Sequence, residues 1–436
     1  MIIPTPRFLI LMLAGVLLAG AGFAVPGLEQ FVLPFNLLLI SAFLITGRIA
    51  RQWDVLEFRR VTDPVLSVRV PNTVRLALKG SSPHPLMVRI RDEVDETFGV
   101  SGNEFQTQIR PDFESEHAYT VVPQYRGQWS FRGLFVEYVA PFGLARVRKQ
   151  IGEQQPVRVY PNVKAVREFE LLKQAGHLSL MGLRKSRLKG LGTEFESLRE
   201  YNEDDYRTID WKASARRGKL VVKNFEQESN QAVMICVDVG RHMLGEIDGV
   251  RKLDYCLDAA LLLMHAAQRA GDMVGLLHFN DSIKRYLEPK KGKAQIAALL
   301  DAIYDTEPEP VQPHYSAAFA YLSSRWKRRS LIVVFTDAEN FDQGQALSQS
   351  LGRMRQRHIV LVVRVKDPKL KTLVGQPITN EERLFGQAAA RWYESDRRKA
   401  ESVLRNAGIQ SIEAEPQDLA NELVGAYLRV KQLNLL

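Results

Sequence analysis

Two apolar runs near the N-terminus constrain this chain more than any other feature of its sequence. Residues 8–25 carry no charge, and residues 31–46 are interrupted only by Pro34 and Asn36. Each run is slightly shorter than the ~20 apolar residues that cross a bilayer comfortably, so local thinning of the bilayer or flanking anchors are required. The two runs predict a two-helix transmembrane hairpin over residues 1–50.

The arginines around the two runs predict the orientation of the hairpin. Arg7 precedes the first run and Arg48 follows the second, whereas the connector carries Glu29 and no basic residue. Because basic residues stay on the cytoplasmic side, we expect the N-terminus and everything after Arg48 in the cytoplasm. The alternative is a signal peptide cleaved near residues 19–21, but the second run would then act as a stop-transfer segment.

Residues 60–161 are expected to form an antiparallel β-sandwich. Short segments in which apolar and polar residues alternate are separated by Gly, Pro and Asn, as is typical of that fold. The predicted strands are 65–70, 73–79, 86–90, 119–123, 129–139 and 157–160. Residues 141–144 are predicted to form a turn with an apolar plug, and residues 162–230 to hold a connector followed by a polar segment.

Residues 231–436 alternate between continuous apolar runs and helical repeats. Continuous apolar runs are typical of strands buried on both faces, so this alternation predicts βα units around a mostly parallel sheet. The predicted strands are 233–237, 273–279, 331–335, 359–365 and 410–413. The predicted helices include 296–303, 315–326 and 418–430, together with a long charged insertion at 381–405.

Composition narrows the possible partners. The net charge is +9 over 436 residues, which suits an anionic membrane surface or an acidic partner. Lys and Arg do not form a block interleaved with aromatic residues, so we do not expect nucleic acid to bind. Cys236 and Cys256 fit no metal-ligand spacing and are expected to be buried thiols in a reducing compartment. The sequence has no P-loop, nucleophile-elbow or zinc-protease motif.

The densest polar cluster lies at residues 192–217. Acidic, basic and aromatic side chains are interleaved there, namely Arg199, Glu203, Asp204, Asp205, Arg207, Asp210, Trp211 and Arg216. Arginine clamps carboxylates through two hydrogen bonds and stacks on tryptophan, so these residues are expected to form one network. The network either fixes an irregular segment to the α/β domain or forms a partner-binding surface. Catalysis is not expected, because no nucleophile or metal-ligand spacing accompanies the carboxylates.

The order of motifs in this cluster resembles the signature of the "domain of unknown function 58" family. The matching motifs are Glu194-Phe195, Leu198-Arg199-Glu200-Tyr201, Asp204-Asp205-Tyr206-Arg207, Ile209-Asp210-Trp211 and Ala215-Arg216. One departure is Asp204, where the family usually has Gly, which affects a turn. The resemblance covers nearly the whole chain. It implies a bacterial inner-membrane protein with a fold similar to the von Willebrand factor type A domain, encoded beside a MoxR-type AAA+ ATPase.

The same resemblance places a candidate site where the strands of the sheet end. In metal-binding members of that fold the first loop reads Asp-x-Ser-x-Ser, and the matching residues here are Asp238, Gly240 and His242. Ser316 from a second loop and Asp337 from a third would complete the site. Mg²⁺ prefers hard oxygen ligands in near-octahedral geometry, and two hydroxyls are replaced here. We therefore expect a degenerate crevice without metal, and Mg²⁺ at Asp238, Ser316 and Asp337 is the alternative.

The two aspartates of this crevice are expected to converge, because each follows a buried strand and open α/β sheets bind ligands at those ends. Without a metal two close carboxylates repel each other, and we expect Arg241 or His242 to supply the missing positive charge. The function that follows is a non-enzymatic membrane adaptor for protein partners, among them a MoxR-type ATPase. The rivals are a metal-dependent adhesion protein and a hydrolase that uses the signature carboxylates.

Overall fold

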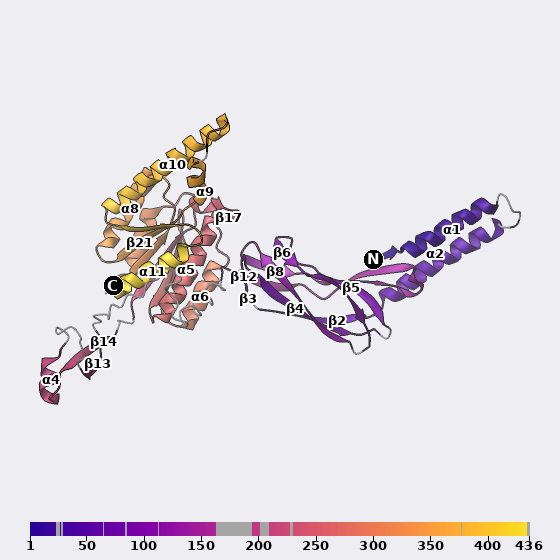
Figure 1. Cartoon of the computed structure of the whole chain (residues 1–436), viewed down its shortest axis with the longest axis horizontal. Helices are drawn as coiled ribbons and strands as arrows, with labels where there is room; N and C mark the ends of the chain where they lie inside the picture. Colours follow the sequence, from indigo (N-terminus) through magenta and orange to yellow (C-terminus); the bar gives the residue numbers. More distant parts are fainter. Residues whose placement is uncertain are drawn as a thin grey trace. The chain divides into compact units, whose positions relative to one another are not determined.

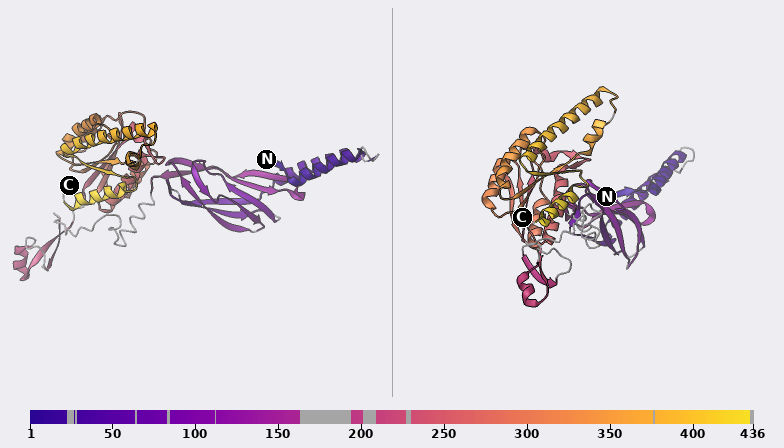
Figure 2. Two further views of the ribbon diagram at one scale, coloured as in Figure 1. Left: turned by 45° about the horizontal axis from the view of Figure 1, so that its top comes forward. Right: turned by 60° about the vertical axis from the view of Figure 1, so that its left-hand side comes forward.

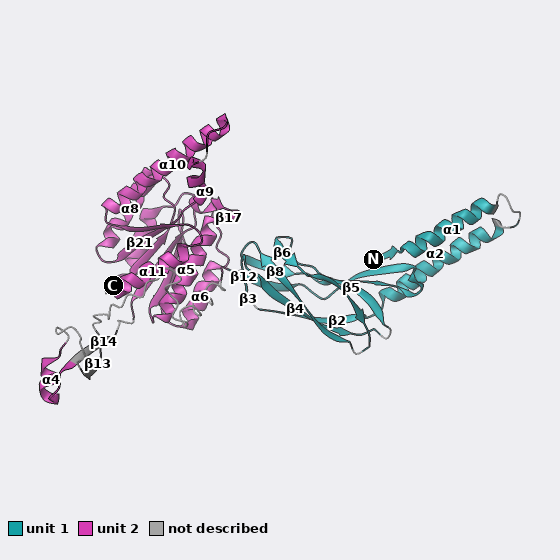
Figure 3. Cartoon of the chain, in the orientation of Figure 1, with its two compact units in different colours: residues 1–160 teal, residues 161–436 magenta. Residues whose placement is uncertain are grey.

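The computed structural model describes residues 1–22, 27, 29–63, 65–82, 85–111, 113–162, 194–200, 209–226, 230–375 and 377–433. Residue contacts divide the chain into two compact units, Met1–Tyr160 and Pro161–Leu436, which are coloured separately in Figure 3. The first unit holds the N-terminal helices and an all-β region, and the second holds an α/β region (Figure 1). Both fold classes were predicted from the sequence.

Both apolar runs form helices, α1 (Pro6–Gly22) and α2 (Glu29–Arg51), which pack against each other. Of the helices in the described residues, Gln30–Arg51 is long and apolar enough to cross a membrane, whereas Pro6–Ala21 is apolar but shorter. Most of their large apolar side chains are exposed, as a lipid-facing surface requires.

The two interruptions of the second run lie inside α2 rather than ending it. Pro34 lies in the second turn of the helix, where its missing N–H removes one backbone hydrogen bond. The Asn36 side-chain amide donates to the Val32 carbonyl at 3.0 Å. This bond satisfies a donor on an otherwise apolar helix, where an unsatisfied polar group would cost several kcal/mol in lipid.

Three sheets of the first unit share one hydrophobic core. The first sheet has the order β1 (Ile2–Pro4), β11 (Ala145–Ile151), β10 (Leu134–Val139), β5 (Leu86–Asp92) and β7 (Glu104–Ile109). The second has the order β2 (Leu56–Thr62), β4 (Asn72–Gly80), β8 (Glu114–Pro123) and β6 (Phe98–Ser101). The third has the order β3 (Val65–Ser67), β12 (Gln155–Tyr160) and β9 (Gly127–Phe131). All pairings are antiparallel except the one between β3 and β12.

One strand prediction for this region was wrong. The predicted strand 129–139 is two strands, β9 and β10, separated at Arg132-Gly133 and placed in different sheets. The turn at 141–144 is a 3-10 turn, η1 (Pro141–Gly143), in which Phe142 is 83% exposed. The apolar plug predicted for this turn is Leu144, which is buried against Phe8 and Leu39 of the two helices.

The second unit is built on a six-stranded sheet with helices on both faces (Figure 2). The strand order is β19 (Ile283–Lys290), β18 (Met273–Phe279), β15 (Ala232–Asp238), β20 (Leu331–Phe335), β21 (Ile359–Val365) and β22 (Gln410–Ala414). All neighbours are parallel except β18 and β19, so the prediction of a mostly parallel sheet is confirmed. The antiparallel edge strand β19 was not predicted, because charged residues break its apolar pattern.

Two hydrophobic cores lie on the two faces of this sheet. One face is covered by α5 (Lys252–Arg269), α6 (Lys293–Ile303) and α11 (Leu419–Gln432). The other face is covered by α7 (Tyr315–Arg325), α8 (Phe341–Arg355) and the C-terminal part of α10 (Glu381–Asn406). Helix α10 is the predicted charged insertion, and the shorter α9 (Pro368–Gly375) packs beside it. The continuous apolar strands therefore sit between two layers of helices, which explains their sequence pattern.

Candidate functional site

The two predicted aspartates lie at one edge of the sheet. Strands β15 and β20 are parallel neighbours, with Val237 paired to Phe335, so the residues that follow both strands emerge together. Asp238 is completely buried. Its Oδ1 accepts a hydrogen bond from the Gly240 backbone N–H at 2.7 Å, and its Oδ2 accepts one from the Thr336 hydroxyl at 2.6 Å.

The Thr336 hydroxyl also contacts the Tyr315 hydroxyl at 2.9 Å, which links β15, β20 and α7 in one buried chain. Burial raises the pKa of Asp238 to about 6, although the hydrogen bonds from Thr336 and Gly240 lower it in part. Each oxygen of the Asp238 carboxylate therefore already accepts a hydrogen bond from within the protein.

The positive charge beside Asp337 comes from Lys252, the first residue of α5. The Lys252 ammonium lies 2.6 Å from Asp337 Oδ2 and 3.4 Å from Glu339 Oε1. On the other side, Arg397 from α10 has a guanidinium nitrogen 3.4 Å from Asp337 Oδ1. Two cations from helices far apart in sequence thus hold one buried carboxylate.

The prediction that Arg241 or His242 supplies this charge was wrong. Both residues belong to η4 (Arg241–Leu244), where the Arg241 side chain is exposed. His242 is buried and lies 3.7 Å from Glu339 rather than at Asp337. Lys252 takes the place instead, because α5 begins directly beneath this loop and the Lys252 N–H donates to the Gly245 carbonyl at 2.7 Å.

The charged side chains at this edge of the sheet shift each other's pKa values. Burial alone would lower the pKa of Lys252, but Asp337, Tyr393 and Glu339 together outweigh the effect of burial and raise the pKa above its ordinary value. Burial would likewise raise the pKa of Glu339, but His242 and Lys252 hold it at about 2. Lys252 and Glu339 are therefore both ionised at neutral pH, and the crevice contains a fixed internal ion pair.

The side chains of this edge do not fit a magnesium ion. Both carboxylates have their oxygens turned to protein donors or cations, and Ser316, the nearest hydroxyl of the second loop in sequence, is exposed on α7. Gly240 and His242 offer no hydroxyl at all. Within the described ranges no three His, Cys, Asp or Glu side chains could hold a metal ion together. An ammonium at hydrogen-bond distance also occupies the position that a cation would need beside Asp337.

One signal in the sequence could have identified Lys252. A cation at the first position of a helix is disfavoured by the helix dipole, which is positive at that end. Lys252 is the first residue of α5, and Arg251 precedes it. Such a placement requires a nearby anion, and Asp337 and Glu339 are the anions found.

The signature segment forms a small element of its own. Strands β13 (Glu194–Glu200) and β14 (Val221–Glu226) are antiparallel, and α4 (Trp211–Arg217) lies between them in sequence. Asp210 is the N-cap of α4, and its Oδ1 accepts hydrogen bonds from the backbone N–H groups of Lys212 and Ala213, both at 3.0 Å.

The signature residues have different environments in this element. Trp211 is 66% exposed and Arg216 is exposed, so neither is part of a core. The backbone of Arg199 pairs with Val222 in the hairpin. The remaining predicted residues, Glu203, Asp204, Asp205 and Arg207, lie outside the described residues, and the predicted network stays a prediction.

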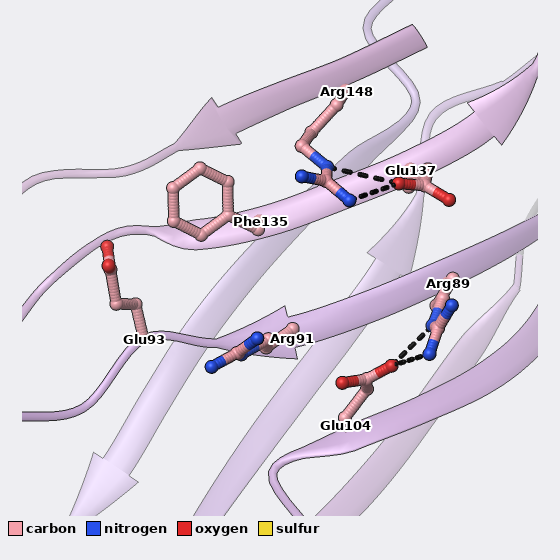
Figure 4. A pocket seen from close by; sticks show the side chains of 7 residues that line it. All are labelled: Arg89, Arg91, Glu93, Glu104, Phe135, Glu137 and Arg148. Carbon is pink, nitrogen blue, oxygen red and sulfur yellow. Dashed lines mark hydrogen bonds and ion pairs between the residues drawn. The ribbon is translucent and has the colours of Figure 1, made fainter. Parts of the chain in front are cut away.

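A second charged surface lies on the all-β unit (Figure 4). It is a pocket of about 270 Å³ on the first sheet, with Phe135 among its lining residues. Its charges pair across neighbouring strands, Arg89 with Glu104 and Arg148 with Glu137, the latter at 2.8 Å. Exposed pairs of this kind contribute little free energy. We regard them as the cross-strand pairs of a solvent-facing sheet and assign no site there.

The fold and these buried charges define an α/β protein with an internal cation at the carboxyl end of its sheet, joined in one chain to an all-β unit with apolar helices. A family model described as "Protein of unknown function DUF58" matches residues 197–384, which include most of the signature. This match supports the DUF58 family, which the signature predicted. No curated protein matches the chain.

Several solved structures resemble parts of the chain weakly. A CARDB domain from Pyrococcus furiosus is 11% identical and covers 24% of this chain and 90% of its own, with a TM-score of 0.18. A FixG-related protein from Vibrio parahaemolyticus is 8% identical and covers 24% and 98%, with a TM-score of 0.19. An uncharacterized membrane spanning protein from Vibrio fischeri is 14% identical and covers 47% and 99%, with a TM-score of 0.17. TM-scores this low carry no argument.

Proposed function

We propose that this chain is a non-enzymatic, membrane-anchored adaptor that binds a protein partner at the crevice of a von Willebrand factor type A-like domain without using a metal. The observation that carries the proposal is the Lys252 ammonium 2.6 Å from Asp337. An ion that bridges the protein and an acidic ligand needs open coordination positions. Here the cation is Lys252 of the chain itself. We therefore expect exposed side chains of the η4 loop, such as Arg241, to recognise the partner.

The crevice suits binding because it is rigid before a partner arrives. The hydrogen-bonded chain from Tyr315 through Thr336 and Asp238 to Gly240 fixes the start of the η4 loop. Less conformational entropy is then lost on association, which favours affinity. The exposed guanidinium of Arg241 stands on this fixed loop and suits an acidic side chain on the partner.

The N-terminal segment supports anchoring through both helices. Strand β1 precedes α1 and pairs with β11, which follows α2 by many residues. The chain therefore enters and leaves the helical hairpin on the same side, beside the all-β unit. With arginines at that end, the positive-inside rule favours a bacterial inner-membrane hairpin whose soluble parts are cytoplasmic. Cleavage of a signal peptide would remove β1 from its sheet.

The family resemblance nominates a MoxR-type AAA+ ATPase as the partner. Its test is affinity capture of the full chain from its own membranes, followed by mass spectrometry, with and without EDTA. We expect the ATPase in both samples, and at least a tenfold loss on Arg241→Glu. Arg353→Glu is the matched control, since Arg353 is an exposed residue of α8. If EDTA abolishes capture and Mg²⁺ restores it, the result would instead favour the metal-dependent adhesion protein. If Arg241→Glu leaves capture unchanged, the η4 loop is not the binding site.

A further inference from the structure

The N-terminal part of α10 carries an exposed apolar face. Phe385 is 70% exposed and Trp392 is 69% exposed, and Ala388 and Ala389 between them are exposed as well. Large aromatic side chains at this exposure are uncommon on soluble surfaces, and a contiguous patch of them is typical of an interaction site. This end of α10 extends past the sheet in Figure 1.

The exposed positions follow a heptad pattern. Glu381, Phe385, Ala388, Trp392, Ser395 and Lys399 are separated alternately by four and three residues, and all six are exposed. That spacing places them along one seam of the helix, as in a coiled coil. We call these six residues the α10 seam.

The other sides of α10 already have neighbours. Gln387, Ala390 and Arg397 are buried, and α10 packs against α8, α9 and β22. Arg391 and Arg398 line a hollow together with Val374 of α9, and Ser395 and Lys399 of the seam line it as well. By contrast, the described residues leave Phe385 and Trp392 of the seam largely uncovered. A binding partner from outside the chain would therefore fit there.

We propose that the occupant is the α10 seam of a second copy of this chain, packed antiparallel. The seam begins with Glu381, which is followed by Glu382, and it ends with Lys399, which is preceded by Arg398. Antiparallel packing centred on residue 390 places Glu381 opposite Lys399 of the second copy and Glu382 opposite Arg398. Parallel packing would place like charges together, which is unfavourable.

The same register also matches the sizes of the side chains. Ala388 lies opposite Trp392 of the second copy, and Phe385 lies opposite Ser395, so each large side chain meets a small one. Arg398 and Lys399 now pair with Glu394 and Asp396 of their own helix, both at 3.3 Å. Exposed pairs within one helix contribute little and exchange readily for pairs across an interface. The dimer does not depend on the proposed ATPase partner.

The register can be tested by crosslinking two single-cysteine variants that carry different tags. Cys236 and Cys256 are both buried, so the introduced thiols are the reactive ones. Glu381→Cys and Lys399→Cys chains are mixed in detergent and treated with a short bismaleimide. We expect a mixed 381–399 product. A 381–381 product should be absent, because 18 residues separate the two positions by about 27 Å along the helices. A dominant 381–381 product would refute the antiparallel register.

A charge exchange tests whether the seam pairs with itself. Glu381→Lys and Lys399→Glu should each weaken the dimer several-fold in analytical ultracentrifugation, and the two changes in one chain should restore it. Phe385→Ser with Trp392→Ser should leave only monomer, and the monomer should stay folded because both side chains are exposed. Arg353→Glu on α8 is the charge control. A chain that is monomeric at all concentrations, or a double charge variant that stays as weak as the singles, would overturn the proposal.

Discussion

At the scale of single residues, the crevice should make stability depend on pH through Asp238. Its folded-state pKa of about 6 lies above the ordinary value of 3.8, so the folded state binds the proton more tightly than the unfolded state. The resulting stability is fully present below pH ~4 and is lost as pH rises through ~6, by about 3 kcal/mol in all. In Asp238→Asn the amide oxygen can still accept from Gly240, and this loss should disappear.

The measurement is urea unfolding of the α/β unit at several pH values between 4 and 8, in parallel for both chains. As pH rises, we expect the free energy of unfolding of the parent chain to fall relative to that of Asp238→Asn. Comparing the two chains cancels the titration of all other groups, including Glu339. A constant difference across this range would show that Asp238 is ionised with an ordinary pKa in the folded protein.

Lys252 gives a second prediction at this scale. Lys252→Met removes the ammonium but leaves the buried Asp337 carboxylate with only Arg397 beside it. Breaking one partner of a buried ion pair costs about 3–5 kcal/mol, because a buried charge remains uncompensated. Adding Asp337→Asn should recover most of that loss, which chemical denaturation can measure. Equal stability of the single variant and the parent chain would mean that the crevice is hydrated rather than closed.

The sequence predicted the two aspartates of this site but not the residues that complete it. The resemblance to the von Willebrand factor type A fold selected Asp238 and Asp337, and both follow recognisable apolar strands. Lys252 is 85 residues from Asp337 in the chain, and only the packing of α5 under the sheet brings them together. Arg364 shows the same limit, because it is buried inside the apolar strand β21 and contacts Glu413 of β22 at 3.5 Å.

At the scale of elements, continuous apolar strands were predicted with the same bounds that the structure has, namely 273–279, 331–335 and 359–365. Their burial on both faces leaves no ambiguity in the pattern. Edge strands such as β1 and β19 were missed, because β1 is three residues long and β19 carries charges toward solvent. These two edge strands depend on a partner strand that their local sequence does not encode, whereas the edge strand β22 was predicted at 410–413.

Asp210 of the signature could act either as the N-cap of α4 or as a buried member of an arginine network. As an N-cap that accepts two backbone hydrogen bonds, Asp210 should stabilise α4 by about 1 kcal/mol. Asp210→Ala should then lower the free energy of unfolding by that amount, and Asp210→Asn, which also caps well, should leave it nearly unchanged. If Asp210 is a buried member of an arginine network, both variants should lose several kcal/mol. Denaturation of the two variants side by side distinguishes the cases.

At the scale of the whole molecule, the pairing of β1 with β11 limits how the two N-terminal helices can be placed in a membrane. Strand β1 at residues 2–4 hydrogen-bonds to β11 at residues 145–151, and α1 and α2 lie between them in sequence. If the two helices cross a membrane, the N-terminus and the all-β unit must share one side of it. The Arg7 side chain close to Gly143 in η1 places a basic residue at that same end.

These relations predict that the N-terminus and all residues after Arg48 are cytoplasmic and that residues 26–30 face outward. A reporter enzyme that is active only outside the cytoplasm should be silent when fused after Leu436 and active when inserted in the connector. Arg7→Glu combined with Arg48→Glu should weaken this preference, because the positive-inside rule counts the basic residues that flank the spans. An active reporter after Leu436 in the parent chain would overturn the hairpin and support a cleaved signal peptide or a single span.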